Sequence, residues 1–290
     1  MSELFDHAFF ARLGRIQLAS HLRLDRGLSG ARKSSARGSS VEFSDFREYL
    51  PGDDIRRIDW NAYGRLDRLY IKQFMEEKEA FYHVLVDNSA SMDFGQEKKL
   101  VMALRLAAVF AYLVQQQLDR VEIVTGHDGR LDRLSPVTGR SGFGRLLQEL
   151  EAVKFAGSTQ LNESVRRLSL NGRGICILLS DFLDPQGIDE AVKYLVYKGQ
   201  EVLLIQVLAR EEVDFAEEGS LALTDLESGQ EVRVTMTRQT LETYQNTLRK
   251  YNEGIEALAR RYGCSYLQVV SDSSLEQVIF ETLQKRGIFS

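Results

Sequence analysis

The stretch Phe81–Ser91, FYHVLVDNSAS, decides the fold. Its first six residues form a run with the length of a buried strand, and the next five place Asp87, Ser89 and Ser91 at alternating positions. A long apolar segment, Lys99–Leu118, follows and is typical of a helix covered on nearly every side. A strand that runs into small oxygen-bearing residues and then a helix is typical of a parallel α/β sheet, whose ligands bind beyond the carboxyl ends of the strands.

Strand and helix patterns alternate along the rest of the chain. Short apolar runs predict four more strands, at Val121–Thr125, Gly174–Ser180, Glu201–Leu208 and Ser265–Val270. Helical patterns occupy Gly144–Val153, Leu161–Leu168, Asp189–Tyr197, Gln239–Tyr262 and Ser274–Lys285. A turn at Glu227-Ser228-Gly229 predicts a hairpin insertion at about 219–237. We therefore predict a doubly wound, mainly parallel, Rossmann-like sheet of about six strands over residues 79–290.

Residues 1–78 have a different pattern and are interpreted as an N-terminal extension. Residues 3–24 have the apolar spacing of a helix, and a Gly/Ser-rich loop follows to about Ser40. The aromatic-rich segment 41–74 predicts short strands and turns, with Leu69–Phe74 as a strand. The charges of its GDDIRRIDW stretch form either a partner surface or an internal network that pins the aromatic extension to the sheet, and the network is the preferred interpretation; these charges are Asp53, Asp54, Arg56, Arg57 and Asp59.

Composition excludes several classes of protein. Apolar residues make up 43% and charged residues 27%, as in ordinary soluble proteins. No apolar run reaches the roughly 18–20 residues that cross a bilayer, and the N-terminus lacks the order of a signal peptide. Two cysteines, Cys176 and Cys264, are too few for a disulfide scaffold or a four-ligand zinc site. We expect a cytoplasmic protein with no transmembrane segment, and peripheral membrane association stays open.

The basic stretch Arg23–Arg37 has two interpretations. It is either an arm for nucleic acid or an anionic surface, or a solvated loop. The stretch has no interleaved aromatic residue and the chain carries a net charge of −5, so the loop is preferred and no nucleic-acid partner is expected.

Oxygen-bearing side chains stand at three places in the predicted fold, directly after two of the strands and before one of the helices. Asp87, Ser89 and Ser91 follow the first strand, Asp181 follows Gly174–Ser180, and Thr159 precedes the helix at Leu161. Hard oxygen donors of this kind suit Mg²⁺ or a similar ion. The alternative is that Ser89, Ser91 and Asp181 cap the helices that follow them.

Three of these strings resemble a known site. VDNSASM at 86–92, GSTQL at 157–161 and LLSDF at 178–182 look like the metal-ion-dependent adhesion site of von Willebrand factor A domains. REYLPGDDIRRIDWNAYGRLDRLYIKQF at 47–74 is similar to the bacterial family labelled "domain of unknown function 58".

The resemblance implies both a metal site and a partner. It implies that Ser89, Ser91 and Thr159 ligate Mg²⁺ or Mn²⁺ through their side-chain oxygens, and that Asp87 and Asp181 act directly or through water. It also implies an open coordination position for an acidic side chain of a partner, and a MoxR-type AAA+ ATPase, or that ATPase's client, as the partner.

An enzyme is the alternative to this binding module. A metal-dependent hydrolase at the same site needs a general base, and His127, after the second strand, is the plausible candidate, although a backbone-bonded loop residue is preferred. His83 lies inside the first strand and is expected to be a packed core residue. The chain has no G-x-x-x-x-G-K-[ST], G-x-G-x-x-G or G-x-S-x-G motif. We expect a non-enzymatic, divalent-metal-dependent protein-binding module.

Overall fold

The computed structural model of the chain describes Phe9, Leu13, residues 41–76, 80–137, 139–170 and 172–285, and Ile288. It divides into two compact units, one of residues 22–79 and one of residues 1–21 together with 80–290. The expected division placed residues 1–21 with the extension instead. Phe9 and Leu13 are helical and buried, whereas the rest of the expected helix at 3–24 and the basic stretch Arg23–Arg37 lie outside the described residues.

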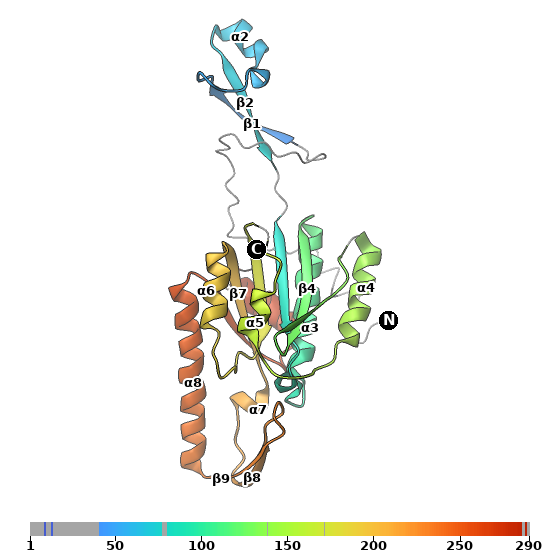
Figure 1. The fold of residues 1–290 in the computed structure, drawn as a ribbon, viewed down its shortest axis with the longest axis vertical. Coiled ribbons are helices and arrows are strands. Elements are labelled where there is room, and N and C mark those ends of the chain that lie inside the picture. The colour runs from blue at the N-terminus through green and yellow to red at the C-terminus, as the bar shows by residue number, and fades with distance from the viewer. Residues whose placement is uncertain are drawn as a thin grey trace. The chain divides into compact units, whose positions relative to one another are not determined.

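The larger unit is built on one six-stranded sheet with the strand order β10-β7-β6-β3-β4-β5 (Figure 1). Five strands are parallel, and β5 pairs antiparallel with β4. The strands are β3 (Phe81–Asp87), β4 (Arg120–His127), β5 (Arg130–Arg133), β6 (Gly174–Ser180), β7 (Gln200–Leu208) and β10 (Ser265–Val270). The predicted doubly wound, mainly parallel sheet is confirmed. The edge strand β5 escaped prediction because its sequence, RLDR, has a single apolar residue.

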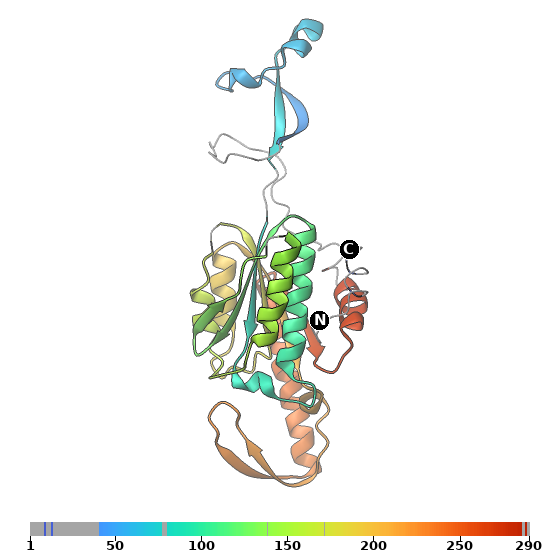
Figure 2. The same cartoon turned by 90° about the vertical axis from the view of Figure 1, so that its right-hand side faces the viewer.

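Helices cover both faces of this sheet, which explains the unbroken apolar strands. Helices α3 (Lys99–Gln116) and α4 (Gly139–Ala152) pack together on one face (Figure 2). The other face carries α5 (Leu161–Arg166), α6 (Asp189–Tyr197) and α8 (Arg238–Arg261), whose buried side chains form one cluster with those of β3, β4, β6 and β7. All seven residues of β6 are buried, as expected for a strand enclosed on both faces.

Helix α3 is long and apolar enough to cross a membrane by length and composition, and is the one such helix in the part of the chain that the structure describes. Inside the protein, however, 72% of this helix is buried. Its apolar surface is therefore accounted for by the sheet and by α4.

Further elements of the larger unit follow β7 and β10. Helix α7 (Arg210–Val213) follows β7, and strands β8 (Gly219–Thr224) and β9 (Glu231–Met236) form the predicted hairpin. Helix α9 (Leu275–Gln277) continues into a π-helical segment, Val278–Leu283, within the helix expected at Ser274–Lys285.

The smaller unit contains an antiparallel pair of strands, β1 (Val41–Glu48) and β2 (Tyr70–Glu76). Between them in sequence lie a short 3₁₀ helix, Ile55–Arg57, and α2 (Trp60–Leu66). Helix α2 was not predicted, because its mixture of aromatic, polar and glycine residues has no helical period.

The three aspartates of the GDDIRRIDW stretch shape the smaller unit locally. Asp53 pairs with Arg47 at 2.9 Å and accepts the Leu50 N–H, Asp54 caps the 3₁₀ helix, and Asp59 caps α2. The hydrogen bond from Arg47, followed by that from Leu50, lowers the pKa of Asp53. All these bonds lie within the smaller unit, so a network that pins the extension to the sheet stays a prediction, and Arg56 and Arg57 are exposed.

Candidate metal centre

The predicted ligands meet at the switch point of the sheet, where the strand order reverses. The chain passes from β3 to β4 in one direction and from β6 to β7 in the other, so the loops that follow β3 and β6 diverge. Asp87 is the last residue of β3, and Asp181 directly follows β6. The Ser180 hydroxyl donates to Asp87 Oδ2 at 2.6 Å and joins the two strand ends.

Three hydroxyl groups form a triangle beside these aspartates. Ser89 Oγ lies 3.0 Å from Ser91 Oγ and 2.8 Å from Thr159 Oγ1, and the third side, from Ser91 to Thr159, measures 3.4 Å. Neighbouring oxygens of an octahedral Mg²⁺ shell with bonds of about 2.1 Å are about 3.0 Å apart. The triangle thus has close to the dimensions of one face of such a shell.

The alternative that these residues cap helices is wrong. Ser89 is the N-cap of a short 3₁₀ helix, Ala90–Asp93, but its hydroxyl makes no capping bond, and the N-cap of α6 is Ile188 and not Asp181. Asp181 Oδ1 accepts the Leu183 N–H at 3.0 Å, a bond within its own loop.

The loop that carries Thr159 is held by a backbone bond to the loop after β3 and by side-chain bonds to Asp128, which follows β4. Ala90 N–H donates to the Gly157 carbonyl at 3.0 Å, and Asp128 accepts both the N–H and the hydroxyl of Ser158 at 2.8 and 2.9 Å. These bonds, the backbone bond first, lower the pKa of Asp128. Gly157 has φ +65°, and a Cβ there would collide with the Asp128 carboxylate. Any larger residue would therefore strain the backbone and displace the Asp128 carboxylate that holds Ser158.

Asp87 is the carboxylate whose charge depends most on its surroundings. Its side chain is buried, and burial, reinforced by the charge of Asp181, raises its pKa to about 6. The bonds from Ser180 and Ser89 oppose this shift without cancelling it.

Sequence reasoning missed a buried lysine at the site. Lys99, the first residue of α3, is 1% exposed, and its Nζ lies 2.6 Å from Asp181 Oδ2 and 2.7 Å from Glu212 Oε1. Burial alone would lower the pKa of Lys99, but the charges of Asp181 and Glu212 outweigh it and raise the pKa, so the ammonium stays charged. The sequence signal that could have identified it is a lysine at the start of an otherwise apolar helix, because a buried lysine almost always has an acidic partner.

The donor set fits a hard divalent cation. Among the described residues, no three His, Cys, Asp or Glu side chains gather in one place, so the ligands would be hydroxyls and two carboxylates. All are oxygen donors, which suit Mg²⁺ or Mn²⁺ better than Zn²⁺. Ionised Asp87, Asp181 and Glu212 with Lys99 leave two negative charges, which a divalent ion would balance.

The two histidines that sequence analysis weighed have different positions. His127 ends β4, and its Nδ1 lies 3.3 Å from Asn88 Oδ1, so the partner in this hydrogen bond is a side chain and not the backbone group that the sequence analysis prefers. His83 is buried in β3 with Nδ1 3.1 Å from Glu122 Oε2, and burial lowers its pKa. The expectation of a packed core residue is confirmed for His83.

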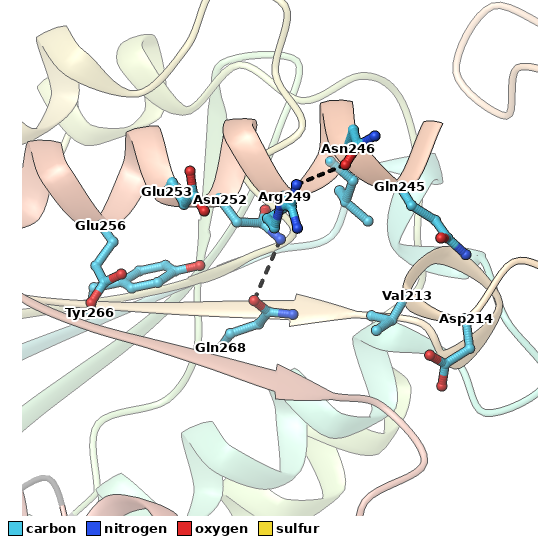
Figure 3. Close-up of a pocket in the computed structure, with 11 residues that line it drawn as sticks. Val213, Asp214, Gln245, Asn246, Arg249, Asn252, Glu253, Glu256, Tyr266 and Gln268 are labelled. Atoms are coloured by element: carbon cyan, nitrogen blue, oxygen red, sulfur yellow. Dashed lines mark hydrogen bonds between the residues drawn. The ribbon is translucent and has the colours of Figure 1, made fainter. Parts of the chain in front are cut away.

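A polar groove of about 510 Å³ between α8, β10 and the end of α7 contains none of the predicted ligands (Figure 3). Arg249 in this groove donates to Asn246 at 2.7 Å, and Asn252 donates to Gln268 at 3.4 Å. The switch point is therefore the stronger candidate site.

Comparison with known proteins gives a family and distant structural likenesses. The family model described as "Protein of unknown function DUF58" matches residues 45–254. Uncharacterized protein Rv1480 of Mycobacterium tuberculosis and uncharacterized protein Mb1516 of Mycobacterium bovis are each 28% identical over 234 residues, which cover 78% of this chain and 74% of theirs.

Two solved structures are similar at low identity. The conserved hypothetical protein BatB from Bacteroides thetaiotaomicron matches with a TM-score of 0.44 and 16% identity, over 72% of this chain and 98% of that one. The SpRpn10 VWA domain matches with a TM-score of 0.39 and 11% identity, over 68% of this chain and 92% of that one. The strand order of this chain itself establishes its doubly wound sheet.

We expect the metal-free protein to lose stability, relative to Asp87→Asn, as the pH rises from about 4 through about 6. The folded-state pKa of Asp87 lies above its ordinary value of 3.8, so the unfolded chain releases this proton first. The contribution of Asp87 to stability is fully present below the pKa of the unfolded chain and is lost as the pH rises through the folded-state pKa. The free energy of unfolding therefore falls by up to about 3 kcal/mol by neutral pH. Urea unfolding of the wild type and of Asp87→Asn in chelator, at several pH values, measures this difference. Free energies of unfolding that change with pH in the same way in both proteins would contradict the prediction.

We also expect Lys99→Met to lower the free energy of unfolding by about 3–5 kcal/mol, because it leaves buried Asp181 and partly buried Glu212 without their cation. The matched control is Lys98→Met, since Lys98 is 46% exposed in its ion pair with Asp93 and should cost under about 1 kcal/mol. Urea unfolding at pH 7 compares the two variants. Equal losses would show that the buried pairs have no special role.

Proposed function

The chain belongs to the DUF58 family of proteins of unknown function, and from the geometry of its switch point we propose that it is a divalent-metal-dependent protein-binding module. Ser89, Ser91 and Thr159 would hold Mg²⁺ or Mn²⁺, with Asp87 and Asp181 beside them. The bound ion would supply an electrophilic position for an acidic side chain of a partner protein.

The triangle of hydroxyl oxygens is the observation that carries this proposal. Ser89 and Thr159 come from loops 70 residues apart in sequence, yet their oxygens are 2.8 Å apart at a buried position. Uncharged hydroxyls neutralise little of the charge of an ion, which leaves it attractive to an incoming carboxylate. Such a site favours binding an acidic group.

Binding is favoured over hydrolysis by the surroundings of the candidate base. His127 directs Nδ1 to Asn88, whose Nδ2 donates to the Lys154 carbonyl at 2.9 Å, so this histidine belongs to the network that supports the loop. We propose a non-enzymatic adaptor, and its partner is proposed to be a MoxR-type AAA+ ATPase or that ATPase's client, as the sequence resemblance implies.

We expect purified protein to bind Mn²⁺, and Ser89→Ala to weaken that binding by at least about tenfold, because it removes one oxygen of the triangle. Ser220→Ala is the matched control, since Ser220 is exposed on β8 and should bind as the wild type does. Electron paramagnetic resonance of free Mn²⁺ measures both affinities. A wild-type protein that binds no Mn²⁺ would overturn the metal site.

A protein partner should be captured from lysate by the wild type in Mg²⁺ and lost in chelator. The double variant Asp87→Ala/Ser89→Ala should lose it in both conditions, because it lacks the ion's ligands. Quantitative mass spectrometry of the four captures identifies the partner. Identical partners in all four conditions would contradict metal dependence, and an AAA+ ATPase among the metal-dependent ones would support the proposed adaptor role.

A further inference from the structure

An acidic side chain of this same chain already lies at the proposed metal site. Glu227, in the turn of the β8–β9 hairpin, has Oε1 3.1 Å from Thr159 N and 2.9 Å from Thr159 Oγ1. Thr159 Oγ1 is the donor in its contacts with both Glu227 Oε1 and Ser89 Oγ, and because a hydroxyl has one proton it can donate to only one of them at a time. Glu227 Oε1 therefore lies at the distance from Thr159 Oγ1 that separates neighbouring oxygen ligands of one ion.

The turn is built to present Glu227. Asp225 Oδ1 accepts the N–H groups of Glu227 and Ser228 at 2.9 and 3.3 Å, and the Ser228 hydroxyl donates to Asp225 Oδ2 at 2.8 Å. These bonds, led by the one from the Glu227 N–H, lower the pKa of Asp225. Gly229 closes the turn with φ +70°. The backbone at Glu227 is thus fixed by its neighbours, and its side chain is left free to reach Thr159.

Burial within the hairpin singles out the same residue. From Asp225 to Gln230, Glu227 alone is partly buried, whereas its apolar neighbour Leu226 is 45% exposed. Both strands are mostly exposed as well, with Val232 at 57%. A turn that covers an acid and exposes a leucine is positioned by the polar contact with Thr159 and not by apolar packing.

The electrostatics of the turn point to a cation. Of the ion pairs found in the described part of the chain, none includes Glu227, whereas Asp181 and Glu212 share Lys99. Glu227 therefore places an acidic side chain beside the hydroxyl triangle without an ion-pair partner among the described residues. A divalent ion at the hydroxyl triangle would be such a partner.

We propose that Glu227 is the acidic ligand that this chain supplies to its own metal site, so that the hairpin covers the position which a partner's carboxylate would take. This inference rests on the proposed metal-dependent function. A partner then binds by replacing Glu227, and the hairpin is released from Thr159 when it does.

The experiment compares the wild type with Glu227→Gln and with Glu231→Gln, a control that makes the same charge change on the same hairpin. Glu231 is exposed and faces Arg233 at 3.6 Å, away from Thr159. We expect Glu227→Gln to weaken Mn²⁺ binding about tenfold and Glu231→Gln to change it less than twofold. Hydrogen exchange of a peptide covering residues 219–236 is the second measurement. Added Mg²⁺ should slow this exchange in the wild type and in Glu231→Gln, and should have no effect in Glu227→Gln.

The outcomes separate this inference from the function on which it rests. Wild-type and Glu227→Gln proteins that bind Mn²⁺ equally, with Mg²⁺ leaving hairpin exchange unchanged in both, would overturn the internal ligand and leave the metal site standing. A wild-type protein that binds no Mn²⁺ would overturn both. Circular dichroism of each variant establishes that the differences arise in folded protein.

Discussion

The buried ammonium of Lys99 is the constraint on which the rest of the site depends. A charge with 1% exposure needs partners of opposite charge, and these are Asp181, directly after β6, and Glu212 in α7, which follows the neighbouring strand β7. The triad joins the start of α3, on one face of the sheet, to the loops after β6 and β7. It therefore fixes the carboxyl ends of the central strands relative to the helix that covers them.

The triad also divides the roles of the two site aspartates. Asp181 already has a cation beside it, whereas Asp87 has hydrogen bonds from Ser180 and Ser89 and a raised pKa. The unmet demand for positive charge is thus concentrated at Asp87, the residue that precedes the hydroxyl triangle in sequence. Lys99 is held by two acids, so the proposed metal ion would be the cation that balances the charge of Asp87.

The sequence predicted what local patterns determine. Enclosed strands such as β6 consist of apolar runs, and Asp87, Ser89, Ser91, Thr159 and Asp181 stand directly after or before such elements. It could not predict contacts that tertiary packing creates. Lys99 meets Asp181 across 82 residues, Glu227 meets Thr159 across 68, and neither pair has a motif. Strand β5 and helix α2 escaped for a different reason, because their sequences lack the apolar period that identifies an element.

Lys99 and Glu227 both contact residues of the candidate site, but they differ in how easily those contacts can be broken. Lys99 is held by two buried ion pairs, whereas Glu227 is held by two hydrogen bonds from Thr159 at the tip of an exposed hairpin. Releasing the hairpin would expose little apolar surface, so its cost is small. If a partner's carboxylate replaces Glu227, one acid–metal contact is exchanged for an equivalent one. The exchange itself contributes little net affinity, and the affinity must come from the other contacts of the partner. An internal acid would thus turn a site able to bind any exposed carboxylate into one that selects a partner with a complementary surface around it.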